Sequence, residues 1–208
     1  MNIFRIKREL EMKIIITMLY LIIIGVLLSS CAMKYDGMYV ILLNDIEING
    51  VKSVYSAVKI NEEKVNKYTY QDENIDFVWH LMNDGIAFSL FNKSGSSLKI
   101  HWDDVLIINE SGIALSVIHK GIKYINKNNH QPPTTVINNS KIDEFIVPKI
   151  KIFSYSDGSW GVYKLIEGGE EAIGRNIKVY LPVEKNSQII EYIFNFHIQD
   201  IQWFNKKS

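Results

Sequence analysis

Residues Ile75–Phe91, IDFVWHLMNDGIAFSLF, contain the clearest strand and turn signals in the chain. Ile86, Phe88 and Leu90 occupy every second position of the second half, which is the side-chain period of a β-strand with one buried face. The first half is also rich in apolar and aromatic residues. Asn83–Gly85 between the halves is typical of a turn, because glycine accepts a positive φ angle. The stretch therefore predicts two antiparallel strands joined by a tight turn.

The same two-residue period recurs on both sides of this stretch. Leu98, Ile100 and Trp102 alternate with Lys99 and His101, which predicts a half-buried strand. Segments bounded by Asn, Gly, Ser or Pro predict further strands at Met38–Ile48, Val51–Ile60, Val105–Ile108, Ile113–Ile118, Thr134–Ile137, Ile142–Ile146, Lys149–Ser154, Asn176–Val183 and Ile189–Ile198. Many short strands without a three-turn amphipathic helix predict an all-β fold, in which two sheets bury their apolar faces on each other.

The N-terminus carries a different pattern, an apolar run at Ile14–Leu28. Four basic residues precede the apolar run: Arg5, Lys7, Arg8 and Lys13. The run suits the core of an export signal and is short for a bilayer-spanning helix, which needs about 20 residues. We therefore predict a helical signal peptide over residues 1–30. Translation from Met1 or from Met12 would retain it.

Leu28–Cys31, LSSC, follows the apolar core and resembles the bacterial lipobox, an aliphatic residue and two small residues before a cysteine. The resemblance implies transfer of a diacylglyceryl group to the Cys31 thiol and cleavage between Ser30 and Cys31. Cysteine suits this modification because its thiolate is nucleophilic. Cys31 is also the only cysteine in the chain, so no disulfide competes for it. The alternative is an uncleaved N-terminal anchor with an incidental cysteine.

These signals predict three parts of the chain: the signal peptide over 1–30, the lipidated cysteine and a short tether over 31–37, and a β-sandwich domain over 38–204. Two or three acyl chains, at about 0.8 kcal/mol per buried methylene group, hold a protein stably on a bilayer. The expected location is the bacterial cell envelope, with the lipid bilayer as a partner through acylated Cys31. Ala32 after the cysteine is similar to lipoproteins of the outer membrane, which applies where the host has two membranes.

The strand segments also resemble those of a protein family. FSLFNKS at 88–94, LKIHW at 98–102, the region from PPT at 132–134 to Pro148, and YIFNF at 192–196 are similar to small bacterial lipoproteins with an immunoglobulin-like domain. The resemblance spans about residues 75 to 200. It implies an immunoglobulin-like antiparallel β-sandwich, and it brings no catalytic residues with it.

Composition limits the partners of the exported part. The first thirty residues hold 4 of the 23 basic and 2 of the 23 acidic residues, which leaves 19 and 21 in the remainder. A near-neutral charge argues against nucleic acid, whose binding requires a basic face. We therefore expect no nucleic-acid partner.

The chain lacks the common signatures of hydrolases, nucleotide-binding proteins and zinc proteases. Five histidines lie in different segments without ligand spacing, and we expect each to be solvated or paired across strands: His80, His101, His119, His130 and His197. Asp103 and Asp104, with Asp84, offer the carboxylate oxygens that Ca²⁺ prefers. The alternative is a charged turn that ends a strand. We expect no metal and no cofactor.

Two loop segments, Tyr124–Pro133 and Tyr155–Tyr163, are rich in Asn, Gly, Pro and aromatic residues. Loops on a rigid sandwich are the usual places for recognition. We select four candidate binding residues from them: Trp160, Tyr155, Tyr163 and His130. An exposed Trp160 would offer a large apolar surface and one donor to a sugar or a protein. Alternatively, Trp160 folds back over the open end of the core.

The sequence thus favours a non-catalytic envelope lipoprotein whose domain binds or scaffolds an envelope protein or glycan. The alternative is an envelope enzyme that acts on glycan through paired carboxylates. Such an enzyme requires a pocket with two carboxylates roughly 5–9 Å apart. A purely structural role is the third reading of the pattern.

Overall fold

The computed structural model describes residues 35–54, 58–59 and 66–205. The signal peptide predicted over residues 1–30, the cleavage position between Ser30 and Cys31, and the lipidation of Cys31 lie outside the described residues. No helix within the described ranges is both long and apolar enough to span a bilayer. Contacts divide the chain into two units, and one of them, Gly37–Trp203, holds nearly all of the described structure.

The strands of the described residues are β1 (Tyr35–Ile48), β2 (Val51–Lys52), β3 (Val58–Lys59), β4 (Asn66–Gln71), β5 (Ile75–Leu81), β6 (Ile86–Asn92), β7 (Leu98–Ile100), β8 (Leu106–Ile108), β9 (Ala114–Ile118), β10 (Thr134–Val136), β11 (Lys141–Pro148), β12 (Ile152–Ser154), β13 (Trp160–Val162), β14 (Asn176–Lys185) and β15 (Gln188–Asn205). The short 3-10 helices are η1 (Trp102–Asp104), η2 (Tyr124–Asn126), η3 (Lys149–Lys151) and η4 (Gly169–Ala172). The all-β prediction is therefore confirmed.

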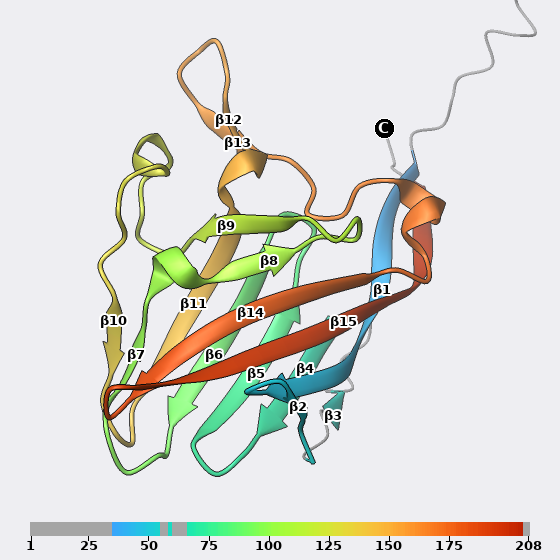
Figure 1. Cartoon of the computed structure of the whole chain (residues 1–208). Coiled ribbons are helices and arrows are strands. Elements are labelled where there is room, and N and C mark those ends of the chain that lie inside the picture. Colours follow the sequence, from blue (N-terminus) through green and yellow to red (C-terminus); the bar gives the residue numbers. More distant parts are fainter. Residues whose placement is uncertain (1–34, 55–57, 60–65, 206–208) are drawn as a thin grey trace, which may run out of the picture. The chain divides into compact units, whose positions relative to one another are not determined.

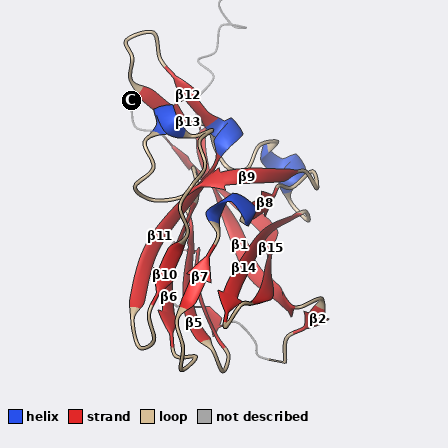
Figure 2. Ribbon diagram, turned by 60° about the vertical axis from the view of Figure 1, so that its left-hand side comes forward, coloured by secondary structure: helices blue, strands red, loops and turns tan. Residues whose placement is uncertain are grey.

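Thirteen of the described strands form one continuous sheet in the order β2-β1-β15-β14-β8-β9-β11-β6-β5-β4-β3, with β7 paired to β14 and β10 paired to β7. The pairs from β15 to β3, and the pairs β1–β2, β7–β14 and β7–β10, are antiparallel. Figure 1 shows this sheet curled into a half-barrel, with β14 and β15 crossing in front of β5 and β6. Figure 2 shows β11, β6 and β5 on one side, and β14, β15 and β1 on the other. The two sides enclose a common core.

The hairpin predicted from Ile75–Phe91 is confirmed by β5 and β6. The two strands pair with Leu81 opposite Ile86 and with Phe77 opposite Leu90. Buried and half-buried residues alternate along both strands. The buried face of each strand therefore follows from the local two-residue period.

Aromatic rings join the two sides of the curled sheet. The ring centroid of Phe194 on β15 lies 5.0 Å from that of Phe77 and 4.6 Å from that of Trp79, both on β5. β5 and β15 are not neighbours in the sheet. Burial of one such side chain contributes about 1.5–3 kcal/mol to stability. The aromatic core therefore keeps the sheet folded over on itself.

The differences from the sequence prediction include one strand that was not predicted and two predicted strands that are shorter. β4 was not predicted, although its buried Tyr68 and Tyr70 lie two residues apart. The predicted strand Val51–Ile60 contains only β2 and β3 within the described residues. The predicted strand Lys149–Ser154 starts with η3, so only Ile152–Ser154 is a strand; Lys151 in η3 is buried and its Nζ lies 2.6 Å from Glu167 Oε1.

Candidate functional site

A hairpin projects from one end of the domain (Figures 1 and 2). β12 and β13 pair only with each other among the described strands, with Phe153 opposite Gly161 and Ser154 opposite Trp160. We call Phe153, Tyr155, Trp160 and Tyr163 the aromatic hairpin. Three of the four sequence-predicted binding residues, Tyr155, Trp160 and Tyr163, therefore lie in one small element.

Local hydrogen bonds form the hairpin turn. The Asp157 carboxylate accepts hydrogen bonds from the backbone N–H of Ser159 at 2.9 Å and from its hydroxyl at 2.7 Å. These bonds lower the pKa of the Asp157 carboxyl below its ordinary value. Gly158 has a φ of +83°, a left-handed conformation that glycine adopts without strain. The tip of the hairpin is thus defined by its own sequence.

The aromatic side chains occupy both faces of the hairpin. The Phe153 ring stacks on Tyr163 with centroids 4.2 Å apart, and it contacts Tyr155 edge-on at 4.9 Å. Trp160 points to the opposite face, because successive strand residues alternate faces. There its ring lies 6.4 Å from that of Tyr124 on η2. Trp160 is 39% exposed and does not belong to the buried core.

The base of the hairpin is firmly attached to the domain. Ile152 belongs to a second buried cluster with Ile118 and Val147, against which Tyr124 and Val162 pack. Lys127 Nζ donates a hydrogen bond to the backbone carbonyl of Ile152 at 2.6 Å. The aromatic side chains are therefore displayed on a rigid support.

A groove of about 330 Å³ adjoins the hairpin and includes Tyr163 in its lining. We call it the terminal groove, because its lining comes from both the first and the last residues of the Gly37–Trp203 unit: Gly37, Ile201 and Trp203. The packing at Gly37 is close, because a Cβ atom there would lie 2.7 Å from the Ile201 side chain and would displace it. Trp203 is 48% exposed. The aromatic hairpin and the terminal groove thus share one end of the Gly37–Trp203 unit.

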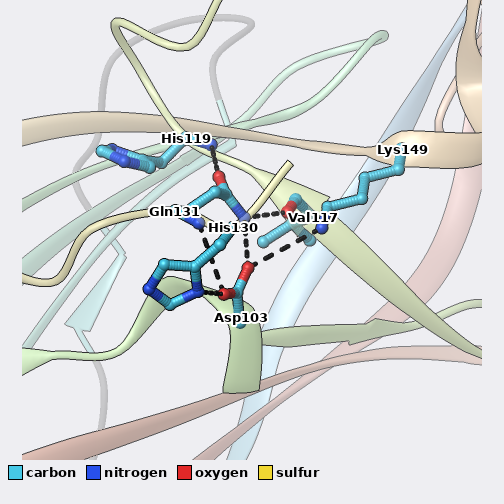
Figure 3. A network of polar contacts seen from close by, with 6 residues as sticks. All are labelled: Asp103, Val117, His119, His130, Gln131 and Lys149. Atoms are coloured by element: carbon cyan, nitrogen blue, oxygen red, sulfur yellow. Dashed lines mark hydrogen bonds and ion pairs between the residues drawn. The ribbon is translucent and has the colours of Figure 1, made fainter. Parts of the chain in front are cut away.

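His130, the fourth candidate, lies in a different polar network (Figure 3). Its Nδ1 contacts the carboxylate of Asp103, to which Gln131 also donates from its backbone N–H and its side chain, both at 3.3 Å. Gln131 is buried and donates to the carbonyl of Val117 at 2.8 Å. The network holds the 119–133 loop against η1, and it does not join the aromatic hairpin.

Asp103 is occupied by these contacts. Burial raises the pKa of its carboxyl, but the hydrogen bonds from Gln131 and His130 outweigh burial, so its pKa lies below the ordinary value. Lys149 Nζ lies 3.8 Å from Asp103 Oδ1. No cluster of three His, Cys, Asp or Glu residues suited to a metal occurs within the described ranges. Asp103 acts as the centre of a loop anchor.

His119 is the histidine whose environment sequence reasoning missed. Its imidazole stacks on Trp102 with centroids 4.1 Å apart and planes at 7°, and its side chain is only 10% exposed. Nδ1 lies 3.3 Å from Glu144 Oε2. The contact with Glu144 on β11, the strand paired with β9, is of the expected cross-strand kind, but the burial of the imidazole against Trp102 was not expected. The signal was absent from the sequence, because Trp102 and Glu144 lie 17 and 25 residues away.

A second groove, of about 220 Å³, lies beside His119 and Tyr124. Neither this groove nor the terminal groove is lined by two carboxylates. Comparison with protein-family models, curated proteins and solved structures gives no match for this chain. The aromatic hairpin with its adjoining groove is the candidate site that the geometry favours.

Proposed function

We propose that the chain is a lipoprotein of the bacterial cell envelope, anchored through acylated Cys31, whose β domain is a non-catalytic binding or scaffolding module. The aromatic hairpin is its contact surface. The supporting observation is the exposure of Tyr155, Trp160 and Tyr163, at 54%, 39% and 54%, on a hairpin that pairs with no other described strand. Exposed aromatic clusters on soluble domains mark interaction sites.

The rigidity of the hairpin base supports a binding role. Association loses less conformational entropy when the contact side chains are already held in place. The Lys127 hydrogen bond to Ile152 and the ion pair of Lys151 with Glu167 both restrain the start of β12, where the hairpin joins the domain. The aromatic hairpin is therefore organised before any partner binds.

We also propose that the curled sheet corresponds to an immunoglobulin-like sandwich. Its support is the packing of β5 against β15 through Trp79 and Phe194, two strands that are separated in the sheet. A sandwich core is formed in the same way, by side chains of two facing layers. The domain would then display the hairpin from one end, where sandwich domains carry their recognition loops.

The anchor is tested by metabolic labelling of the full chain with a fatty-acid analogue. We expect label on the parent, and no label with an unprocessed, larger form for Cys31→Ser. Ser29→Ala is the matched control, because it keeps a small residue before the cysteine and should be labelled like the parent. Equal label on Cys31→Ser would refute the lipoprotein assignment.

The contact surface is tested by a photoreactive residue at Tyr155 of the anchored protein in its own envelope. Ile189 is the control position, because its side chain is 49% exposed at the far end of β15 from the terminal groove. We expect an adduct with an envelope component from position 155 and not from position 189. Equal yields at both positions would refute the hairpin as the contact surface.

A further inference from the structure

The exposed aromatic side chains of the domain gather at one end. Tyr155, Trp160, Tyr163 and Trp203 are the most exposed aromatic residues in the described part of the chain, at 39–54%. All four belong to the aromatic hairpin or to the terminal groove. By contrast, the other two tryptophans, Trp79 and Trp102, are fully buried. A partner of this end therefore meets a surface rich in tryptophan and tyrosine.

The chain length places this end close to the predicted anchor. Six residue steps separate Cys31 from Gly37, which lines the terminal groove. A fully extended chain covers at most about 3.3–3.6 Å per residue, so Gly37 stays within about 20 Å of the lipidated cysteine. The terminal groove must therefore lie within reach of the lipid headgroups.

The arrangement of the rings indicates what kind of medium surrounds them. Phe153, Tyr155 and Tyr163 share one face of the hairpin, and Trp160 lies on the other. Trp160 stays 39% exposed although its ring lies beside Tyr124 of the same domain. Exposed tryptophan and tyrosine rings suit the interfacial layer of a bilayer, which offers both apolar and polar groups.

We propose that the ligand of the aromatic hairpin and the terminal groove is the interfacial layer of the bilayer in which Cys31 is anchored. This inference rests on the proposed lipoprotein function. Tryptophan and tyrosine concentrate at the headgroup level of membranes, because their rings combine apolar area with one polar group. The domain would stand on its membrane with this end down and with the β14–β15 turn pointing away from it.

The hairpin tip limits the depth of contact. Asp157 lies at the tip and stays ionised at neutral pH, and a charged side chain is costly in the hydrocarbon core. The groove lining also contains both a basic residue, Lys164, and an acidic one, Glu167. The contact is therefore expected in the headgroup layer, and it does not depend on anionic lipid.

The test uses the full, acylated chain, in which two tryptophans are exposed at the proposed contact and two are buried in the core. We reconstitute the protein in vesicles of phosphatidylethanolamine and phosphatidylglycerol, with acyl chains that are plain or brominated near the headgroup end. We expect bromine to quench part of the tryptophan emission of the parent. The double variant Trp160→Phe/Trp203→Phe should lose this quenching, because only the buried Trp79 and Trp102 still emit.

The orientation is tested by adding Ile189→Trp to the double variant. Residue 189 lies fourteen residues from Trp203 along β15, about 45 Å at 3.3 Å per residue. The new tryptophan should not be quenched. Each variant is compared with the parent by far-ultraviolet circular dichroism, so that a folding defect is recognised.

The outcomes separate the two proposals. An acylated parent without quenching, or equal quenching of a tryptophan at position 189, would overturn the membrane contact and leave the lipoprotein assignment intact. An adduct from position 155 to a protein or glycan in place of lipid would do the same. A parent without acyl label would overturn the proposed function itself.

Discussion

At the scale of single residues, the strand before η1 separates a core position from a surface position. Ile100 is fully buried, whereas His101 is half-buried and its Nε2 lies 2.7 Å from Glu184 Oε2. We expect Ile100→Ala to lower the free energy of unfolding by about 2–5 kcal/mol, because the truncation leaves a cavity. His101→Ala should lower it much less. Chemical denaturation of both variants beside the parent measures the ranking, and a larger loss for His101→Ala would contradict it.

Asp103 gives a residue-scale prediction on pH. Its folded-state pKa lies below the ordinary value of 3.8, so its stabilising effect is present above that pH and is lost as the pH falls through the folded-state pKa. Asp103→Asn should therefore be less stable than the parent at neutral pH, and the difference should shrink on acidification. Unfolding free energies measured across this pH range test the sign. Asp104→Asn is the control for the loss of one nearby charge, and a difference that grows on acidification would contradict the prediction.

At the scale of elements, the hairpin β12–β13 is locally stabilised and separate from the main sheet. A Cβ atom at Gly161 would lie 2.5 Å from the Phe153 ring, so Gly161→Val must displace that ring. We expect faster amide hydrogen exchange in β12 and β13, and unchanged exchange in β5 and β6, because stability is distributed in local units. Ser156→Val, at an exposed position of the same hairpin, is the matched control. Unchanged exchange in Gly161→Val would show that the ring is not packed on this glycine.

At the scale of the whole molecule, the Gly37–Trp203 unit contains its own aromatic core. Residues 38–204 produced without the signal should therefore fold as a monomer. We expect a far-ultraviolet circular dichroism spectrum dominated by β structure, and a monomeric mass in analytical ultracentrifugation. A helix-dominated spectrum would contradict the all-β fold.

Local patterns in the sequence were sufficient for most strands and for their buried faces. The side-chain period of a strand is two residues, so Phe194 and Phe196 indicate their common face without any knowledge of the partner strand. Tyr155, Trp160 and Tyr163 lie in one hairpin for a similar reason, because nine residues and one turn contain all three. The buried Tyr68 and Tyr70 of β4 follow the same period. Their alternation covers only two apolar positions among polar neighbours, so it did not lead to a strand prediction.

Only the tertiary structure decided which distant segments meet. The sequence analysis selected His130 as a candidate binding residue together with the aromatic hairpin residues, yet contact with Asp103, 27 residues earlier, holds it in a separate network. The terminal groove brings together Gly37 and Trp203, the first and last residues of the unit in the sequence, and no local signal predicts that contact. The physical reason is that strand period and turn preference act between near neighbours along the chain. The order of strands in the sheet, and hence the position of the groove beside the hairpin, depends on the packing of side chains such as Trp79 and Phe194.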